Sequence, residues 1–446
     1  MGPVLGIQVR MEVEESMTGE CERADPAGEV HDGSNRRDRI HRYGRGVNRK
    51  VQSFRPLWMG VLLLWVLAGC GAEPDPSVKG GNGDRGTETR PPESPLPTAR
   101  FEEDRPEPTV LDQEWSGPPP ACTLSDREAF QERVRSISAT APVNSFLIRH
   151  QGETIAEHYI GSMNAGSYHN IKSASKSLLS LWVGIAIEQE YLESVDESIA
   201  PWFPEYFDAN PDSPKADITI RDLLTMQTGL ASTSGHNYGT WVMSGNWVRY
   251  ALERPLTGTP GVDRVYSTGT THLLGVILAR ASGMTLRAFA EQYFFDPLGI
   301  SVGGWDRDPQ GNSMGGNNLA LRPIDLLTIG EMVMHLGEYE GRQIVPASWI
   351  REAIRPYSGR GRVHDYGYLW FRRMAGPWHE VYAWGNGGQF LKIYPELETV
   401  VVITSREGGG ARREDRFRLF ERIDEELLPC LTAPFGEVRP TGEPLY

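Results

Sequence analysis

The sequence predicts an α/β (α+β) fold, with helices flanking an antiparallel sheet and a mostly helical lobe beside it. Three observations lead to this prediction. Short apolar runs typical of strands occur near both ends of the globular region, at 144–149 and 154–160 and again between 366 and 404. The segment between these runs shows the apolar periodicity of helices. Its most apolar stretch, 173–190, predicts a central helix that is buried on nearly every face.

The elements follow in a clear order along the chain. An amphipathic stretch at 125–138 predicts a first helix, and the two N-terminal apolar runs around the turn 150–153 predict a β-hairpin. After the central helix, further helices are predicted at 220–227, 271–282, 286–294 and 323–336. The C-terminal part predicts strands at 366–372, 381–384, 390–394 and 399–404, followed by a last helix at 414–428. The sheet is therefore assembled from both ends of the chain.

Composition narrows the function classes. The 446 residues are enough for one large core, and 39% of them are hydrophobic. The formal net charge of −14 disfavours nucleic-acid binding, which needs a clustered cationic face. Histidines such as His150, His169 and His272 lack metal-ligand spacing, so no metal site is predicted.

A short apolar run near the N-terminus predicts export. Residues 57–69 are too few for a comfortable bilayer span of about 20 residues, but they follow basic residues, as in a signal peptide. The sequence Leu67-Ala68-Gly69-Cys70 resembles the lipobox, at which signal peptidase cuts before a lipid-modified cysteine. We therefore expect 1–69 to be a leader and Cys70 to anchor the chain to a membrane of the bacterial cell envelope. The alternative is a buried apolar helix with an incidental cysteine.

Residues 70–120 are rich in Pro, Gly and charged residues and poor in apolar ones, which predicts a disordered tether before a catalytic domain at 121–435. Cys122 and Cys430 flank this domain. In an oxidising compartment we expect them to form one disulfide between its two ends. The alternative is two unpaired cysteines.

Ser173 and Lys176 form an S-x-x-K element at the start of the central helix. A spacing of three residues places both side chains on one helical face, where the amine can reach the hydroxyl. Burial among apolar neighbours would lower the pKa of the lysine far enough for it to act as a base. On this motif alone, a helix-capping serine beside a solvated lysine remains an equal alternative.

Further motifs in a fixed order support the catalytic interpretation. The sequence resembles the serine β-lactamase-related family, which includes class C β-lactamases, D-alanyl-D-alanine peptidases, family VIII esterases and 6-aminohexanoate-dimer hydrolases. The resemblance covers about 144–405 and implies a β-lactamase/transpeptidase-like fold. It also implies that Tyr266 shares the acid–base work and passes a proton between Ser173 and the leaving group. The motifs that carry it are Ser173-x-x-Lys176, the segment 223–230, Pro260-Gly261, Tyr266-Ser267 and Pro297-Leu298-Gly299.

The third motif of this family, a Lys/His-Thr-Gly triplet on a strand beside the site, corresponds here to Gly385-Asn386-Gly387. The cationic residue is absent. A backbone N–H of Gly388 or Gln389 is expected to join that of Ser173 in an oxyanion hole. Without a cation to bind a substrate carboxylate, neutral esters and linear amides are favoured over β-lactams. A plain hairpin turn is the alternative for this glycine-rich run.

Two other segments are weaker candidates. The run 314–318 resembles the family's substrate-facing loop, so Asn318 is expected to hydrogen-bond the substrate. Tyr238 is a candidate for the wall of the acyl pocket, with an ordinary exposed loop aromatic as the alternative. Gly299-Ile300-Ser301-Val302-Gly303 matches the G-x-S-x-G nucleophile elbow, but a helix precedes it and a loop follows it, which is the wrong context.

The sequence therefore predicts a serine hydrolase that cleaves an ester or linear amide through an acyl-enzyme on Ser173, with no cofactor. Two alternatives stay open. One is a D,D-carboxypeptidase or β-lactamase, and the other is a non-catalytic ligand-binding lipoprotein with the same fold.

Overall fold

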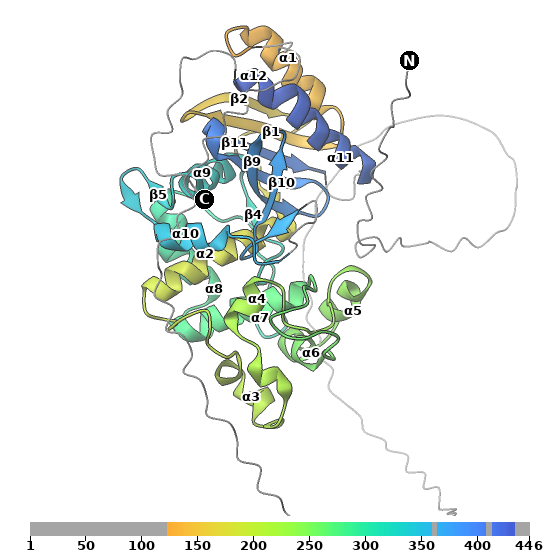
Figure 1. The fold of residues 1–446 in the computed structure, drawn as a ribbon, viewed down its shortest axis with the longest axis vertical. Coiled ribbons are helices and arrows are strands. Elements are labelled where there is room, and N and C mark those ends of the chain that lie inside the picture. The colour runs from red at the N-terminus through yellow and green to blue at the C-terminus, as the bar shows by residue number, and fades with distance from the viewer. Residues whose placement is uncertain (1–122, 359–363, 407–412, 433–446) are drawn as a thin grey trace, which may run out of the picture. The chain divides into compact units, whose positions relative to one another are not determined.

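A computed structural model describes residues 123–358, 364–406 and 413–432 of the chain (Figure 1). The predicted leader, the tether and the candidate lipid attachment site Cys70 lie outside these residues. Cys430 is disulfide-bonded. Its predicted partner, Cys122, also lies outside the described residues, so their pairing stays a prediction.

The central element is a seven-stranded antiparallel sheet in which the two ends of the chain meet. The first strand lies directly beside the last one, with Phe146 opposite Ile403. This arrangement confirms the prediction of a sheet built from both ends of the sequence. In spatial order the strands are β2 (Glu153–Tyr159), β1 (Val143–His150), β11 (Thr399–Ser405), β10 (Gln389–Tyr394), β9 (Trp378–Gly385), β8 (Phe371–Ala375) and β7 (Asp365–Tyr366).

Helices cover both faces of the sheet (Figure 1). Because side chains alternate along a strand, Phe146 and Ile148 of β1 pack into one apolar cluster while Leu147 between them packs into the other. The cluster on one face includes residues of α1 (Arg127–Ser138), α12 (Leu428–Leu431) and the end of the helical segment that starts with α11 (Arg413–Arg422). The cluster on the other face includes α2 (Ser175–Glu188), α9 (Pro323–Met334) and α10 (Ala347–Ala353).

A mostly helical lobe is inserted between the N-terminal and C-terminal strands. Its longest helix, α7 (Thr268–Ser282), is buried over most of its length and ends at Gly283 in the left-handed conformation (φ 68°). A two-stranded sheet of β3 (His169–Asn170) and β4 (Ala320–Leu321) and a short hairpin of β5 (Glu338–Tyr339) and β6 (Arg342–Gln343) complete this part of the chain. The other helices of the lobe are α3 (Pro204–Phe207), α4 (Ile220–Leu224), α5 (Tyr238–Val242), α6 (Trp247–Glu253) and α8 (Leu286–Ala290).

Two predicted elements differ from the structure. The single strand predicted at 366–372 is wrong, because the chain leaves the sheet between β7 and β8. There Leu369 takes a left-handed conformation (φ 62°), its N–H donates to Leu224, and its carbonyl accepts from Ser177. The central helix also begins later than predicted, since Ser173 lies in a separate 3-10 turn, Lys172–Ala174, before α2.

Among the described residues, no single helix is both long and apolar enough to cross a membrane. The pair Thr268–Ser282 and Leu286–Leu298, bent by 78°, reaches that length and composition only together.

Candidate active site

Ser173 lies in a tight turn whose backbone is held from both sides. The preceding residue, Lys172, has a left-handed backbone (φ 51°), which is unusual for a residue with a side chain. Its N–H donates to the Asn170 side chain at 2.9 Å, and its carbonyl accepts from the Ser175 hydroxyl at 2.8 Å. Such a conformation costs on the order of 1 kcal/mol and persists where surrounding contacts impose it. These contacts present the partly exposed Ser173 just before the buried helix α2.

Lys176 is buried beside Ser173, with 2% of its surface exposed. Its Nζ lies 3.0 Å from the Oγ of Ser173, 2.6 Å from the carbonyl oxygen of Gly316 and 3.3 Å from the Oγ1 of Thr268. The predicted contact between the amine and the hydroxyl is therefore present in the structure.

The surroundings of Lys176 favour its neutral form. Burial lowers the pKa of its amine to about 7. A neutral amine has two N–H donors and one lone pair. Gly316 and Thr268 can accept the two hydrogens, which leaves the lone pair for the hydroxyl proton of Ser173. The arrangement is that of a general base.

Tyr266 completes the group around the serine. The Ser173 hydroxyl acts on the phenol of Tyr266 and tends to lower its pKa, and the Tyr266 ring lies under Lys176, with Nζ 5.2 Å from the ring centroid. Burial raises the pKa of Tyr266 to about 12, so the phenol stays protonated near neutral pH and can donate a proton. The hydroxyl of Ser232 fixes the backbone by donating to the Tyr266 carbonyl at 2.6 Å.

A neighbouring loop orients the start of α7, which carries Thr268 towards Lys176. The Thr233 hydroxyl accepts the N–H of Gly269 at 2.7 Å, and the Ser234 hydroxyl accepts that of Thr268 at 2.9 Å. These hydroxyls satisfy helix N–H groups that Ser267, at the N-cap position, leaves unbonded. Sequence reasoning missed this role, because the capping residues lie some 34 positions before the helix.

The glycine-rich turn between β9 and β10 lies against the turn that carries Ser173. A Cβ on Gly385 would lie 2.1 Å from the carbonyl oxygen of Ile171, so only glycine allows this approach. The N–H of Gly388 donates to the Gly385 carbonyl at 3.3 Å, and Asn386 is exposed at the tip. The Gln389 side chain binds the backbone N–H and carbonyl of Ser405 (3.1 and 2.9 Å), so it holds β11 in place. The oxyanion role of this turn stays a prediction for its backbone.

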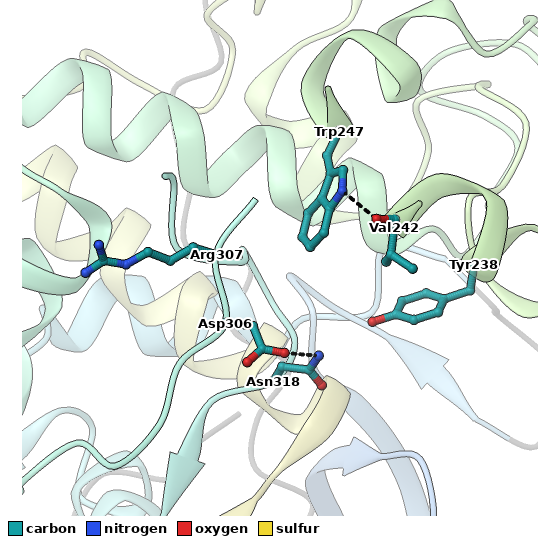
Figure 2. A pocket seen from close by; sticks show the side chains of 6 residues that line it. All are labelled: Tyr238, Val242, Trp247, Asp306, Arg307 and Asn318. Carbon is teal, nitrogen blue, oxygen red and sulfur yellow. Dashed lines mark hydrogen bonds between the residues drawn. The ribbon is translucent and has the colours of Figure 1, made fainter. Parts of the chain in front are cut away.

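Asn318 lines a pocket that is linked through Asn170 to the turn that carries Ser173. Its side chain accepts a hydrogen bond from Asn170 at 3.1 Å and donates one to Asp306 at 2.8 Å. The pocket has a volume of about 400 Å³. Figure 2 shows the Tyr238 hydroxyl, Asp306 and Asn318 directed towards one another, whereas the Arg307 side chain extends away from them. The lining residues are Tyr238, Val242, Trp247, Asp306, Arg307 and Asn318.

Tyr238 is therefore a pocket residue rather than an ordinary loop aromatic. Its hydroxyl accepts a hydrogen bond from the Asn317 side chain at 2.9 Å. The other walls, Val242 and Trp247, were not predicted. They come from the same inserted segment as Tyr238, but their spacing carries no motif that would have marked them.

The alternative nucleophile Ser301 has no elbow around it. It is exposed and follows a short 3-10 turn, Asp296–Leu298, that ends at Gly299. No strand precedes it directly and no helix follows it before α9 in this fully described stretch. A nucleophile elbow needs both elements, so this alternative is excluded.

Comparison with known proteins agrees with this architecture. Residues 128–422 match the family model described as Beta-lactamase. Over 146 residues the chain is 25% identical to penicillin-binding protein 4* of Bacillus subtilis (strain 168), and the match spans 31% of the length of each protein.

Solved structures show the same fold. One is a Bacillus anthracis protein provisionally designated a 6-aminohexanoate-dimer hydrolase (TM-score 0.57, 18% identity, covering 66% of this chain and 82% of that one). Another is EstCE1, described as a hydrolase with promiscuous acyltransferase activity (TM-score 0.55, 19% identity, covering 66% and 99%). A third is the octameric penicillin-binding protein homologue of Pyrococcus abyssi (TM-score 0.52, 17% identity, covering 66% and 76%). With the family match over most of the chain, these findings show that the protein belongs to the β-lactamase family of serine hydrolases.

Proposed function

We propose that this hydrolase cleaves an ester or linear amide through an acyl-enzyme on Ser173, with Lys176 and Tyr266 moving the proton. The observation that carries the proposal is the state of Lys176. Its amine is buried, has a pKa lowered to about 7, and lies 3.0 Å from the serine hydroxyl. Its other two hydrogen-bonding partners are fixed oxygens.

The proposed reaction has two halves. In the first, Lys176 accepts the hydroxyl proton as the Oγ of Ser173 attacks the carbonyl carbon, and Tyr266 donates a proton to the leaving alcohol or amine. In the second, the phenolate of Tyr266 takes a proton from a water molecule that attacks the acyl carbon, and Lys176 returns its proton to the departing Oγ of Ser173, which releases the acid and the free serine. The backbone N–H of Ser173 and one from Gly388 or Gln389 would stabilise the oxyanion in both halves.

The pocket supports a neutral substrate with an apolar group. Tyr238, Val242 and Trp247 supply apolar walls, and the side chain of Asp306 also lines the pocket. The segment Gly385-Asn386-Gly387, which corresponds to the family's Lys/His-Thr-Gly triplet, carries no cationic side chain that could bind a substrate carboxylate. A carboxylate-bearing substrate would meet Asp306 without that compensating charge.

The second candidate function is action on β-lactams or D-alanyl peptides. The similarity to penicillin-binding protein 4*, which covers 31% of each chain, supports this second candidate. A labelled penicillin that forms an adduct persisting for hours would support this function over the esterase.

A substrate panel tests the proposal. We expect short-chain p-nitrophenyl esters and linear anilides to be hydrolysed by the wild type and not by Ser173→Ala, while a chromogenic cephalosporin is turned over at least about a hundredfold more slowly. The matched control Ser301→Ala should keep full activity. Turnover of the cephalosporin with no ester or amide hydrolysis would contradict the proposal.

We also propose that Cys70 carries a lipid that anchors the mature enzyme in the cell envelope. The support is the sequence before it, since this residue lies outside the described part of the chain. The full-length protein should appear in the membrane fraction and incorporate labelled palmitate, and Cys70→Ala should do neither. Equal membrane association of the two proteins would contradict the anchor.

A further inference from the structure

A buried pair, His272 and Asp308, lies behind the backbone that contacts the catalytic lysine. His272 belongs to α7 and is 0% exposed, and Asp308, in the loop after the short turn at Gly299, is 5% exposed. Their side chains meet with the His272 Nε2 3.1 Å from the Asp308 Oδ2. Neither residue contacts Ser173, so the mechanism above does not use them.

The hydrogen bonds of His272 define its tautomer. The N–H of Gly315 donates to the Nδ1 of the ring at 3.3 Å, so Nδ1 must present a lone pair. The single ring proton of a neutral imidazole then lies on Nε2, which donates it to Asp308.

Both carboxylate oxygens of Asp308 accept hydrogen bonds from fixed donors. Its Oδ1 accepts the backbone N–H groups of Gln310 and Asn312 at 2.9 and 2.8 Å. Its Oδ2 accepts from His272 and from the Asn312 side chain at 2.8 Å. Burial tends to raise the pKa of Asp308, but the hydrogen bonds from His272 and Asn312 outweigh it and hold the pKa below its usual value. The carboxylate therefore stays ionised and fixes the imidazole tautomer.

Gly315, which His272 holds, is followed by Gly316, which contacts Lys176. The Gly315 carbonyl accepts from the Thr271 hydroxyl at 3.0 Å, and the next carbonyl, that of Gly316, accepts from Lys176 at 2.6 Å. A Cβ on Gly315 would lie 2.3 Å from the Thr271 carbonyl oxygen, and one on Gly316 would lie 2.6 Å from the Cγ of Lys176. The two glycines thus fill the whole gap between α7 and the lysine.

We infer that His272 and Asp308 are positioning residues of the hydrolase, which hold the Gly315 N–H so that the Gly316 carbonyl stays against the Nζ of Lys176. The same pair reaches the substrate pocket. The rings of Trp241 and Trp247 lie edge-on to His272, with centroids 5.9 and 5.5 Å away, and Trp247 lines the pocket. His272 and Asp308 therefore lie between Trp247 of the pocket wall and the backbone that contacts Lys176. The inference rests on the proposed function, in which Lys176 is the base.

Asp308→Asn tests the inference with almost no change in shape. If the asparagine oxygen accepts the backbone N–H groups of Gln310 and Asn312, as Oδ1 does in the wild type, the new NH₂ group faces the Nε2 of His272. If the amide is flipped, the NH₂ group faces those two backbone N–H groups instead, which is unfavourable. In the first orientation the ring proton is forced to Nδ1, where it meets the Gly315 N–H. We expect kcat to fall about 10- to 100-fold, with KM changed less than about twofold.

Two readouts separate positioning from a loss of folding. The ¹⁵N NMR shifts of His272 should show the proton moving from Nε2 to Nδ1. The acid limb of the kcat/KM profile should move up by about one pH unit, because a loosened Gly316 lets water reach Lys176 and relieves the burial that lowers its pKa. The titratable groups that face Lys176 are Ser173 and Tyr266, with Arg264 beyond Tyr266, and Asp308→Asn alters none of them.

The matched control is His150→Gln. His150 is a buried histidine that pairs with the Thr399 hydroxyl at 2.8 Å, on β1 and β11. Its loss should lower the melting temperature but leave kcat and the pH profile unchanged. If Asp308→Asn does not fold, Thr271→Val is the second test variant. It keeps the shape of the side chain and removes the hydrogen bond to the Gly315 carbonyl, so kcat should fall about threefold.

The outcomes are distinct. A wild type that hydrolyses nothing at Ser173 overturns the proposed function. An active wild type whose folded Asp308→Asn variant, or folded Thr271→Val variant, shows the wild-type kcat and pH profile overturns this inference alone.

Discussion

The Nζ of Lys176 lies 3.0 Å from the Oγ of Ser173 inside a pocket of fixed oxygens, and burial lowers the pKa of the amine to about 7. The two residues are three positions apart in sequence but belong to different elements, a 3-10 turn and helix α2. The proposed acyl transfer depends on this contact, because the amine must take the hydroxyl proton.

The pH dependence of kcat/KM should follow the titration of the Lys176 amine. Because a base must be deprotonated, kcat/KM should rise with pH through a midpoint near 7. Tyr266, whose pKa is raised to about 12, stays protonated, so the plateau should extend beyond pH 9. Rates measured between pH 5 and 9.5 check this. A midpoint near 4 would instead identify a carboxylate as the base.

The stability of the fold should show the same titration. The unfolded chain binds a proton on Lys176 up to its usual pKa of about 10.5, whereas the folded protein releases it near 7. Between these values the unfolded state holds more protons, so the stability of the wild type relative to Lys176→Met should rise with pH, by about 1.4 kcal/mol per unit at most. Urea unfolding at pH 7 and pH 9.5 measures this difference. A difference between the two proteins that does not change with pH would contradict the lowered pKa.

Gly385→Ala should damage both the fold and the site. The added Cβ would meet the carbonyl of Ile171 at 2.1 Å and push β9 away from the turn that carries Ser173. We expect a loss of about 2 kcal/mol in the free energy of unfolding and a fall of about tenfold in kcat. Gly304→Ala is the control, because no atom lies within 4 Å of its Cβ position. Equal behaviour of the two variants would show that the close approach has no consequence.

The pocket should set the size of the accepted acyl group. Val242→Phe fills part of its wall, so kcat/KM for a hexanoate ester should fall about tenfold or more while that for acetate changes little. Met243→Phe, at the adjacent and 85% exposed position, should leave both rates unchanged. If Val242→Phe lowers the two rates equally, the pocket does not bind the acyl chain.

Much of the fold could be predicted from local sequence patterns. The short apolar runs of β1 and β11, which are buried on both faces of the sheet, predict these strands without tertiary information. The break between β7 and β8 could not be predicted, because it is imposed by contacts of Leu369 with α2 and α4, which are distant in sequence.

The candidate site also contains residues that could be predicted from the sequence and residues that could not. Ser173, Lys176 and Tyr266 could be selected from the sequence because the proposed chemistry needs particular side chains in a set order. Thr268 and the carbonyl of Gly316 act through backbone geometry or a common hydroxyl, so no residue pattern marks them. His272 and Asp308 are 36 positions apart, and only the folded chain shows that they form a pair.

Intact-mass spectrometry after reaction with a fluorophosphonate tests the central claim most directly. The wild type should gain one probe mass on the peptide that contains Ser173, and Ser301→Ala should behave identically. Ser173→Ala should gain none, and Lys176→Met should react at least about a hundredfold more slowly at pH 8. Labelling of a folded Ser173→Ala protein, or undiminished labelling of Lys176→Met, would contradict the account of Ser173 as the nucleophile and Lys176 as its base.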